Sequence, residues 1–188
     1  HYKWHYGLFS NTQSSPGIKN INLEDMNISI KSLDSSSRDI NIGSIATESS
    51  IVTNCKTSGI IRVSGIATNL SMGGIVVRAN KITDCTNRIH LIAATDKTNM
   101  NIGGIACIVV EDTLISNCDN FGNISGFSTS DDDVNCGGIV AYNSRTNITN
   151  CNNSGSIEAS NYNAVFVGGI LATVSYTHLR AHETTLHL

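Results

Sequence analysis

The chain has 188 residues, a net charge of −3 at neutral pH and charged side chains at only 14% of its positions. This balance does not favour nucleic acid or an anionic membrane surface as a partner. No apolar run approaches the roughly 18 residues that a membrane-spanning helix needs.

Ile, Asn, Ser, Thr and Gly dominate the composition, and proline occurs once. Residues with a branched Cβ favour strands, whereas Asn and Gly favour tight turns. No long stretch has helical periodicity, so the expected fold class is all-β. The chain begins with His1 rather than Met and ends abruptly at Leu188, which we interpret as a fragment of a longer protein.

In chain order, the first segment, His1 to Tyr6, is rich in aromatic residues and is interpreted as the end of a structural repeat. The segments Gly7-Leu8-Phe9 and Ile18 to Leu23 then form a degenerate copy of a unit that recurs downstream. Ile21 takes the position in this copy that a cysteine takes in the later ones.

Three blocks recur in a fixed order from residue 43 onward. The first is Gly-Gly-Ile, once Gly-Ser-Ile, and its first glycines are 30, 30, 34 and 31 residues apart. The second ends in Asn-Cys or Asp-Cys, and the third is an aliphatic residue six positions after that cysteine. The three sets are Gly43, Gly73, Gly103, Gly137 and Gly168; Cys55, Cys85, Cys118 and Cys151; and Ile61, Leu91, Ile124 and Ile157.

Blocks that keep their phase over several periods predict stacked coils of short strands, because one coil cannot bury its apolar face alone. Stacked parallel strands lie about 4.8 Å apart, so equivalent residues form ladders. The four cysteines are expected to point inward. A second inward ladder is expected at Ile75, Ile105, Ile139 and Ile170, and an outer or corner position at Asn54, Asp84, Asn117 and Asn150.

The sequence therefore predicts a right-handed parallel β-solenoid, or β-helix, of about five to six coils of roughly 30 residues in residues 1–173. The coils are expected to start near residues 7, 43, 73, 103, 137 and 168. The coils differ in length between Gly-Gly-Ile and the cysteine, and again before the next glycine, so loops are expected there. The longest period contains Ser128 to Asp133, which we place on a protruding turn.

The order Gly-Gly-Ile, Ile-Thr-Asn-Cys, Asn-x-Gly-x-Ile resembles the GLUG-motif repeats of bacterial surface proteins. Related repeats occur in large adhesins and in the N-terminal regions of immunoglobulin-A-specific metallopeptidases. The clearest copy spans residues 137–157, and the resemblance covers roughly residues 7–173. Arg88 and Ile89 depart from the usual Ser-Gly, and Ser44 replaces a glycine. The resemblance implies a β-solenoid on a secreted or wall-attached protein and supplies no catalytic residues.

The repeat stops after Thr173, and residues 174–188 are interpreted as a non-native tail that resembles a translated sequencing adapter. Within it, residues 182–186 approach the His-Glu-x-x-His pattern of zinc proteases. Leu186 stands where the second histidine ligand would be required, so no metal site is expected there.

Six cysteines are present, four in the ladder together with Cys107 and Cys136. None lies in a Cys-x-x-Cys pair, which argues against structural zinc. Cysteines one coil apart could approach disulfide distance. We favour the simpler interpretation, a small apolar residue that fills a tight inward corner.

Carboxylates are scattered over the coil rather than clustered as in polysaccharide lyases and hydrolases. They include Asp84, Asp96, Glu111, Asp112 and Asp119. The acidic run Asp131 to Asp133 could bind calcium through oxygen ligands, but a solvated turn is favoured. His90, the one histidine of the repeats, is expected to be structural.

We therefore expect a structural or adhesive module of a bacterial protein, secreted or on the cell surface (cell wall), that is not an enzyme. No catalytic, cofactor-binding or metal-binding residue is assigned, and no cofactor is expected. The expected partners are a glycan or protein of a host or cell surface, not nucleic acid. The alternative is a fragment of a pectate-lyase-like carbohydrate-active enzyme. Acids converging with Lys or Arg on one face of neighbouring coils would favour the enzyme, and a flat Asn, Ser and Thr face the scaffold.

Overall fold

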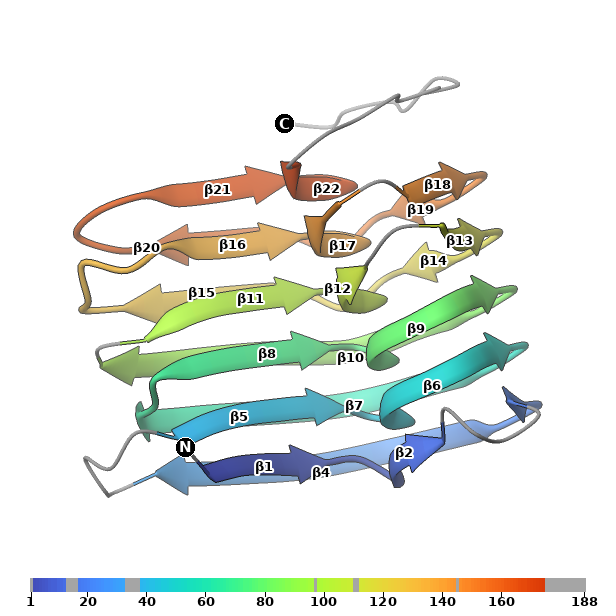
Figure 1. The fold of residues 1–188 in the computed structure, drawn as a ribbon, viewed down its shortest axis with the longest axis horizontal. Coiled ribbons are helices and arrows are strands. Elements are labelled where there is room, and N and C mark those ends of the chain that lie inside the picture. The colour runs from blue at the N-terminus through green and yellow to red at the C-terminus, as the bar shows by residue number, and fades with distance from the viewer. Residues whose placement is uncertain are drawn as a thin grey trace.

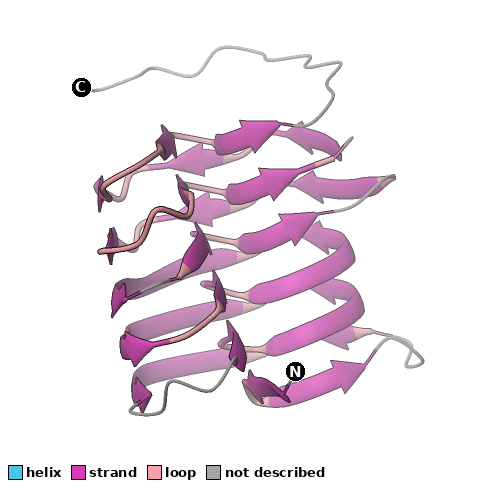
Figure 2. Cartoon of the chain, turned by 60° about the vertical axis from the view of Figure 1, so that its left-hand side comes forward, coloured by secondary structure: helices cyan, strands magenta, loops and turns pink. Residues whose placement is uncertain are grey.

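In the computed structural model the chain winds as stacked coils of β-strands (Figure 1, Figure 2). The structure describes residues 2–12, 17–32, 38–96, 98–109, 112–144 and 146–174, and these ranges contain no helix. In Figure 1 the front strands run to the right and the long rear strands run to the left as the chain rises, so the coil is right-handed. The predicted right-handed parallel β-solenoid is confirmed, with about five turns.

Three parallel sheets, which we name A, B and C, form the walls of the solenoid. Sheet A contains β1 (Tyr2–Tyr6), β5 (Arg38–Gly43), β8 (Asn69–Gly73), β11 (Asn99–Gly103), β16 (Val134–Gly137) and β21 (Val165–Gly168). Sheet B contains β2 (Phe9–Thr12), β3 (Ile18–Lys19), β6 (Ala46–Thr53), β9 (Val76–Thr83), β12 (Ala106–Val109), β13 (Thr113–Ser116), β17 (Val140–Asn143), β18 (Thr146–Thr149) and β22 (Leu171–Val174). Sheet C contains β4 (Asn22–Ser32), β7 (Lys56–Ile66), β10 (Thr86–Asp96), β14 (Asp119–Asn120), β15 (Ile124–Ser128), β19 (Asn152–Asn153) and β20 (Ile157–Ser160).

The register of the strands confirms the phase of the three sequence blocks. In sheet C the aliphatic residues of the third block are direct partners from coil to coil, and in sheet A so are the first glycines. The Gly-Gly-Ile isoleucines also stack, because the N–H of Ile75 bonds to the carbonyl of Ile105 at 3.1 Å and that of Ile105 to Ile139 at 3.0 Å. The degenerate first copy joins the same stack, since β2 and β3 both pair with β6.

Two apolar clusters fill the interior. One lies beneath sheet B and contains the isoleucine ladder and the ladder cysteines. The other lies between sheets A and C and contains side chains such as Ile61, Leu91, Met72 and Ile102. Full burial of each large aliphatic side chain contributes roughly 1.5–3 kcal/mol. Each side chain is buried largely by its equivalents in the coils above and below, so stability grows with stacking.

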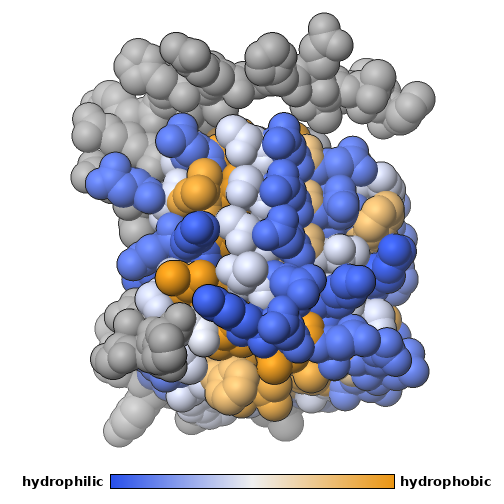
Figure 3. All heavy atoms as spheres, turned by 90° about the vertical axis from the view of Figure 1, so that its right-hand side faces the viewer, coloured by the Kyte–Doolittle hydropathy of each residue, from blue (hydrophilic) through white to orange (hydrophobic). Residues whose placement is uncertain are grey.

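The outer corner between sheets B and C is formed by the residue before each cysteine. Asn54, Asp84, Asn117 and Asn150 have φ between 50° and 57°, a left-handed backbone that Asn and Asp tolerate better than most residues. All four are exposed, as predicted. Their side chains bond along the axis, with Asn117 Nδ2 donating to Asp84 Oδ1 at 3.1 Å. Figure 3 faces this corner and shows hydrophilic side chains running along it in a column.

A buried asparagine column lines the inner side of the same turns. Asn87 Nδ2 donates to Asn120 Oδ1, and Asn120 Nδ2 donates to Asn153 Oδ1, both at 2.7 Å. Each of these amides also bonds to the backbone two residues onward, so the polar groups of the turn find partners inside the solenoid. The coil that contains Cys55 has Thr57 in this position, and its hydroxyl donates to Asn87 Oδ1 at 2.9 Å.

Differences in length between Gly-Gly-Ile and the cysteine are accommodated in sheet B, which is one of the two places where the sequence predicted loops. The single strands β6 and β9 correspond to the divided pairs β12 and β13, and β17 and β18, in the longer coils. The predicted turn at residues 128–133 was partly wrong. Ser128 ends β15, and Ser128 and Ser130 are buried, whereas Thr129 and Asp131 to Asp133 are exposed. The two hydroxyls accept backbone N–H bonds at 3.2 and 2.8 Å, which holds the start of this turn against the body.

Candidate functional site

The ladder cysteines lie at the inner side of the corner between sheets B and C. Cys55, Cys85 and Cys118 are fully buried, and Cys151 is half-buried in the last complete coil. Each thiol donates to the carbonyl oxygen two residues earlier, at 3.2 to 3.3 Å. All six cysteines are free, which agrees with the expected role as small inward residues.

Burial and hydrogen bonds between cysteines shift the pKa values of the thiols in both directions. Burial raises the pKa of Cys107 and of Cys136 from the ordinary 9.0 to about 12. Hydrogen bonding to Cys85, followed by burial, raises the pKa of Cys55. Hydrogen bonding to Cys151 and Cys85 raises the pKa of Cys118. The same hydrogen bonds lower the pKa of Cys85 and of Cys151, so the thiols of the column titrate as one coupled set.

The acidic residues considered from the sequence do not come together. Asp84 lies at the outer corner, Asp112 adopts a left-handed turn with φ of 62°, and Asp119 begins β14. Glu111 lies outside the described residues. Among the described residues no group of three or more His, Cys, Asp or Glu side chains could hold a metal ion.

Two further sequence interpretations concern His90 and the acidic run. The ring nitrogen Nδ1 of His90 accepts the backbone N–H of Asn123 in the next coil at 3.1 Å, a contact that ties neighbouring coils together. The backbone carbonyls of Asp131 and Asp132 accept side-chain amide bonds from the following coil. Residues 175–188, which contain the tail histidines, lie outside the described residues.

The outer face of sheet C carries two hollows, and the first is charged. It has a volume of about 390 Å³ and lies across β4, β7 and β10. We call it the charged hollow, and it is lined by Asn22, Glu24, Asp25, Lys56, Thr57, Ser58, Thr86 and Arg88. Two carboxylates and two cations from three successive strands therefore share one depression.

A β-bulge in β4 places the two acids of the charged hollow. The pairing of β4 with β7 shifts register between Leu23 and Met26, and Asp25 adopts a left-handed φ of 54°. The N–H of Asp25 donates to Ser58 Oγ at 3.2 Å, which fixes the bulge to the next strand. Bulges of this kind redirect side chains and are frequent beside functional sites.

Arg88 is the irregular residue of the charged hollow. Its equivalents in the neighbouring coils are Ser58 and Phe121, and its guanidinium carbon lies 4.3 Å from the ring centroid of Phe121. Stacking uses the face of the guanidinium and leaves its N–H donors, which lie in its plane, directed outward from the ring.

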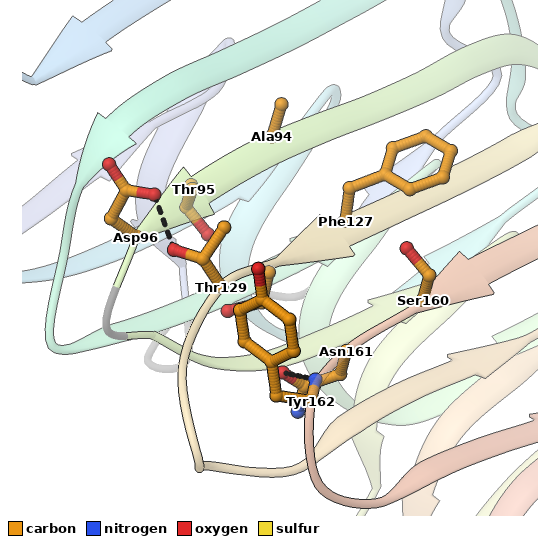
Figure 4. Close-up of a pocket in the computed structure, with 9 residues that line it drawn as sticks. Ala94, Thr95, Asp96, Phe127, Thr129, Ser160, Asn161 and Tyr162 are labelled. Atoms are coloured by element: carbon orange, nitrogen blue, oxygen red, sulfur yellow. Dashed lines mark hydrogen bonds between the residues drawn. The ribbon is translucent and has the colours of Figure 1, made fainter.

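The second hollow, of about 440 Å³, lies at the other end of the strands of sheet C (Figure 4). We call it the aromatic hollow, and it is lined by Ala94, Thr95, Asp96, Phe127, Ser128, Thr129, Ser160, Asn161 and Tyr162. Figure 4 shows Ala94, Phe127 and Ser160 projecting from neighbouring strands on the same side. Thr129 Oγ1 donates to Asp96 Oδ1 at 2.5 Å, so the carboxylate is held at the edge of the hollow.

Neither hollow was found from the sequence. Arg88 was noticed only as a departure from the repeat, and Asp96 only as one of several scattered acids. The exposed aromatic residues Phe127 and Tyr162 were missed, although a large apolar residue at an outward position of a strand is the signal that marks them. A flat Asn, Ser and Thr face, the feature that would favour the scaffold over the enzyme, is therefore present only in part.

Stacked coils joined by axial ladders define this chain as a parallel β-solenoid repeat protein. Within that class, residues 133–158 match the GLUG motif, which confirms the resemblance drawn from the repeat. The match falls on the copy that contains Gly137, Cys151 and Ile157. No curated protein and no solved structure matches the chain. The described ranges contain no helix long and apolar enough to span a membrane.

Proposed function

We propose that this chain is a non-catalytic structural and adhesive module of a bacterial secreted or cell-surface protein. The observation that carries the proposal is the constant register of its ladders from β7 to β20. Each coil repeats the same cross-section, and the buried polar groups of the turns satisfy one another rather than converging on a reactive centre. Such an arrangement suits a protein that extends along one axis and presents a continuous outer surface.

The physical role of the module follows from its hydrogen bonding. Backbone bonds run along the axis, so each added coil lengthens the solenoid by about 4.8 Å and resists bending. The continuous outer face of sheet C, with its two hollows, is the surface available for contact with a partner. The module would hold the domains attached to it away from the cell and present this face to a partner.

A flow-retention assay tests the adhesive role. Beads coated with the chain are passed over surfaces coated with matrix proteins and with glycans, and the detached fraction is measured. We expect retention on at least one surface and release by excess soluble chain. Absence of retention on every surface, in a chain shown by circular dichroism to be folded, would contradict the proposal.

A second candidate, a carbohydrate-active enzyme of the pectate-lyase-like class, is favoured by the charged hollow. Glu24, Asp25, Lys56 and Arg88 there bring acids and bases onto one face of neighbouring coils. Incubation with polygalacturonate and measurement of reducing ends and unsaturated products distinguishes the two candidates. Turnover that disappears in Arg88→Lys and Glu24→Gln would establish the enzyme, whereas the non-catalytic module gives no turnover.

A further inference from the structure

We propose that the aromatic hollow of sheet C binds an uncharged hexopyranose unit of a glycan chain. This inference rests on the adhesive role proposed above and gives that role a ligand class and a location. Four features of the hollow support this ligand: an apolar aromatic ring, a hydrogen-bonded carboxylate, a loop anchored to the coil below, and a negative charge.

Phe127 supplies the platform. It points outward from β15, is 40% exposed and packs into neither apolar cluster of the interior. Its direct partners on the neighbouring strands are Ala94 and Ser160, whose small side chains leave the ring uncovered on both sides. One face of a pyranose ring presents C–H groups, and such a face packs on an aromatic ring.

Asp96 supplies the hydrogen-bonding group. It ends β10 one coil below Phe127, and one of its carboxylate oxygens accepts the Thr129 hydroxyl at 2.5 Å. A carboxylate has about four acceptor sites on two oxygens, so a single bond leaves capacity for two neighbouring sugar hydroxyls. Bonds to an ionised acceptor are about twice as strong as bonds between neutral groups.

The loop after β20 closes the third side and is held in place before any ligand arrives. Asn161 Oδ1 accepts the backbone N–H of Tyr162 at 2.8 Å, and Asn161 Nδ2 donates to the carbonyl of Asp132 in the coil below. The Tyr162 ring is 79% exposed above this anchored backbone. A site whose backbone is already fixed loses less conformational entropy on binding.

Size and charge narrow the ligand class. The volume of about 440 Å³ falls within the roughly 300–1,000 Å³ of small-ligand sites. Among the described residues that line the hollow, Asp96 is the one charged residue, and the exposed Asp131 to Asp133 lie on the adjoining turn. This negative corner repels uronates and sulfated sugars, so the site favours neutral sugars.

The test measures binding of the whole chain to cellohexaose, mannohexaose, β-1,4-galactohexaose and tetragalacturonate by calorimetry and by ligand-observed NMR. We expect at least one neutral hexaose to bind and tetragalacturonate not to bind. Phe127→Ser, which installs the residue found at the neighbouring position 160, should weaken that binding at least tenfold, and Asp96→Asn should weaken it several-fold. Phe121→Ser is the matched control, because Phe121 is also an exposed phenylalanine on sheet C but lies outside the hollow.

Three outcomes would overturn the inference: no neutral hexaose binds, tetragalacturonate binds better than every hexaose, or Phe127→Ser and Phe121→Ser weaken binding equally. Circular dichroism of both variants separates lost binding from lost folding. Retention of beads on a protein surface, without binding of any hexaose, would leave the adhesive module standing and remove only the sugar site.

Discussion

At the residue scale, the buried asparagine column explains why Asn follows each cysteine by two positions in three coils. Asn87, Asn120 and Asn153 bond to one another and to the turn backbone, so the inward N–H and C=O groups of these turns are satisfied without water. A buried amide that lost its partner would cost about 1–3 kcal/mol. The coil of Cys55 keeps the column with the smaller Thr57, and this is the coil in which Ser44 stands in place of the usual glycine.

Asn120→Ala should lower the free energy of unfolding by roughly 3 kcal/mol, because the amides above and below and the backbone of Gly122 all lose a partner. Urea denaturation followed by circular dichroism measures the change. Asn152→Ala, an exposed substitution on the next coil, is the control and should change stability by less than about 0.5 kcal/mol. Equal effects of the two substitutions would show that the column is not a source of stability.

Burial of Cys107 and Cys136 predicts a loss of stability in alkali. Their pKa values are about 12 in the folded chain and 9.0 ordinarily, so between these pH values only the unfolded thiols lose protons. The unfolded state then binds fewer protons, and the free energy of unfolding falls as pH rises, by on the order of 1 kcal/mol per thiol and pH unit. Urea midpoints from pH 8 to about pH 12 should fall more steeply for the unsubstituted chain than for the Cys107→Ala, Cys136→Ala double variant. Parallel curves would contradict this.

At the scale of the element, four coils turn from sheet A to sheet B through two glycines that have different reasons to lack a side chain. A methyl group at Gly103 would lie 1.8 Å from the carbonyl oxygen of Ala106, because the chain folds back over itself. A methyl group at Gly104 would lie 2.0 Å from the carbonyl oxygen of Gly138 and 2.5 Å from the side chain of Asn120. The Gly-Gly pair is therefore required by the turn and by the asparagine column together.

Gly104→Ala should destabilise the chain by roughly 3 kcal/mol or more, because the clash involves backbone of the next coil. Thermal unfolding monitored by circular dichroism compares the stability of Gly104→Ala with that of Gly169→Ala. Gly169 holds the same position in the last coil, where an added methyl group meets nothing within 4 Å, so its substitution should change stability by less than about 0.5 kcal/mol. If Gly104→Ala were as harmless as Gly169→Ala, the packing argument for the second glycine would fail.

At the scale of the whole molecule, the last described coil leaves core positions uncovered. Val165 and Val167 are 37% and 51% exposed, although their partners one coil below, Val134 and Cys136, are fully buried. The first described coil likewise exposes Phe9 and Leu8. Parallel edges with an apolar interior are templates for further strands, and the two ends of a solenoid have the same cross-section.

We expect concentration-dependent, end-to-end association of the chain, measured by sedimentation velocity and light scattering. The Val165→Lys, Val167→Lys variant places two charges on the upper edge and should shift the distribution toward monomer. Asn80→Lys with Ala94→Lys adds the same charge at exposed positions on β9 and β10, strands that are paired on both sides, and should not. A chain that stays monomeric at all concentrations without any substitution would contradict the expectation.

The repeat in the sequence determined the solenoid, the inward cysteine and isoleucine ladders and the outer Asn corner, because residues one period apart must stack when coils do. The tertiary structure alone decided what lies on the outer face of sheet C. Arg88 meets Phe121, and Asp96 meets Thr129, each across the 33 residues that also separate the ladder residues of these coils, but the repeat does not show that Arg88 and Asp96 border hollows. The bulge before Met26 likewise depends on how β4 pairs with β7, which the repeat does not show. The ladders follow from the periodicity of the sequence. The hollows arise where one coil departs from that periodicity, and their depth and lining residues depend on the strands on either side.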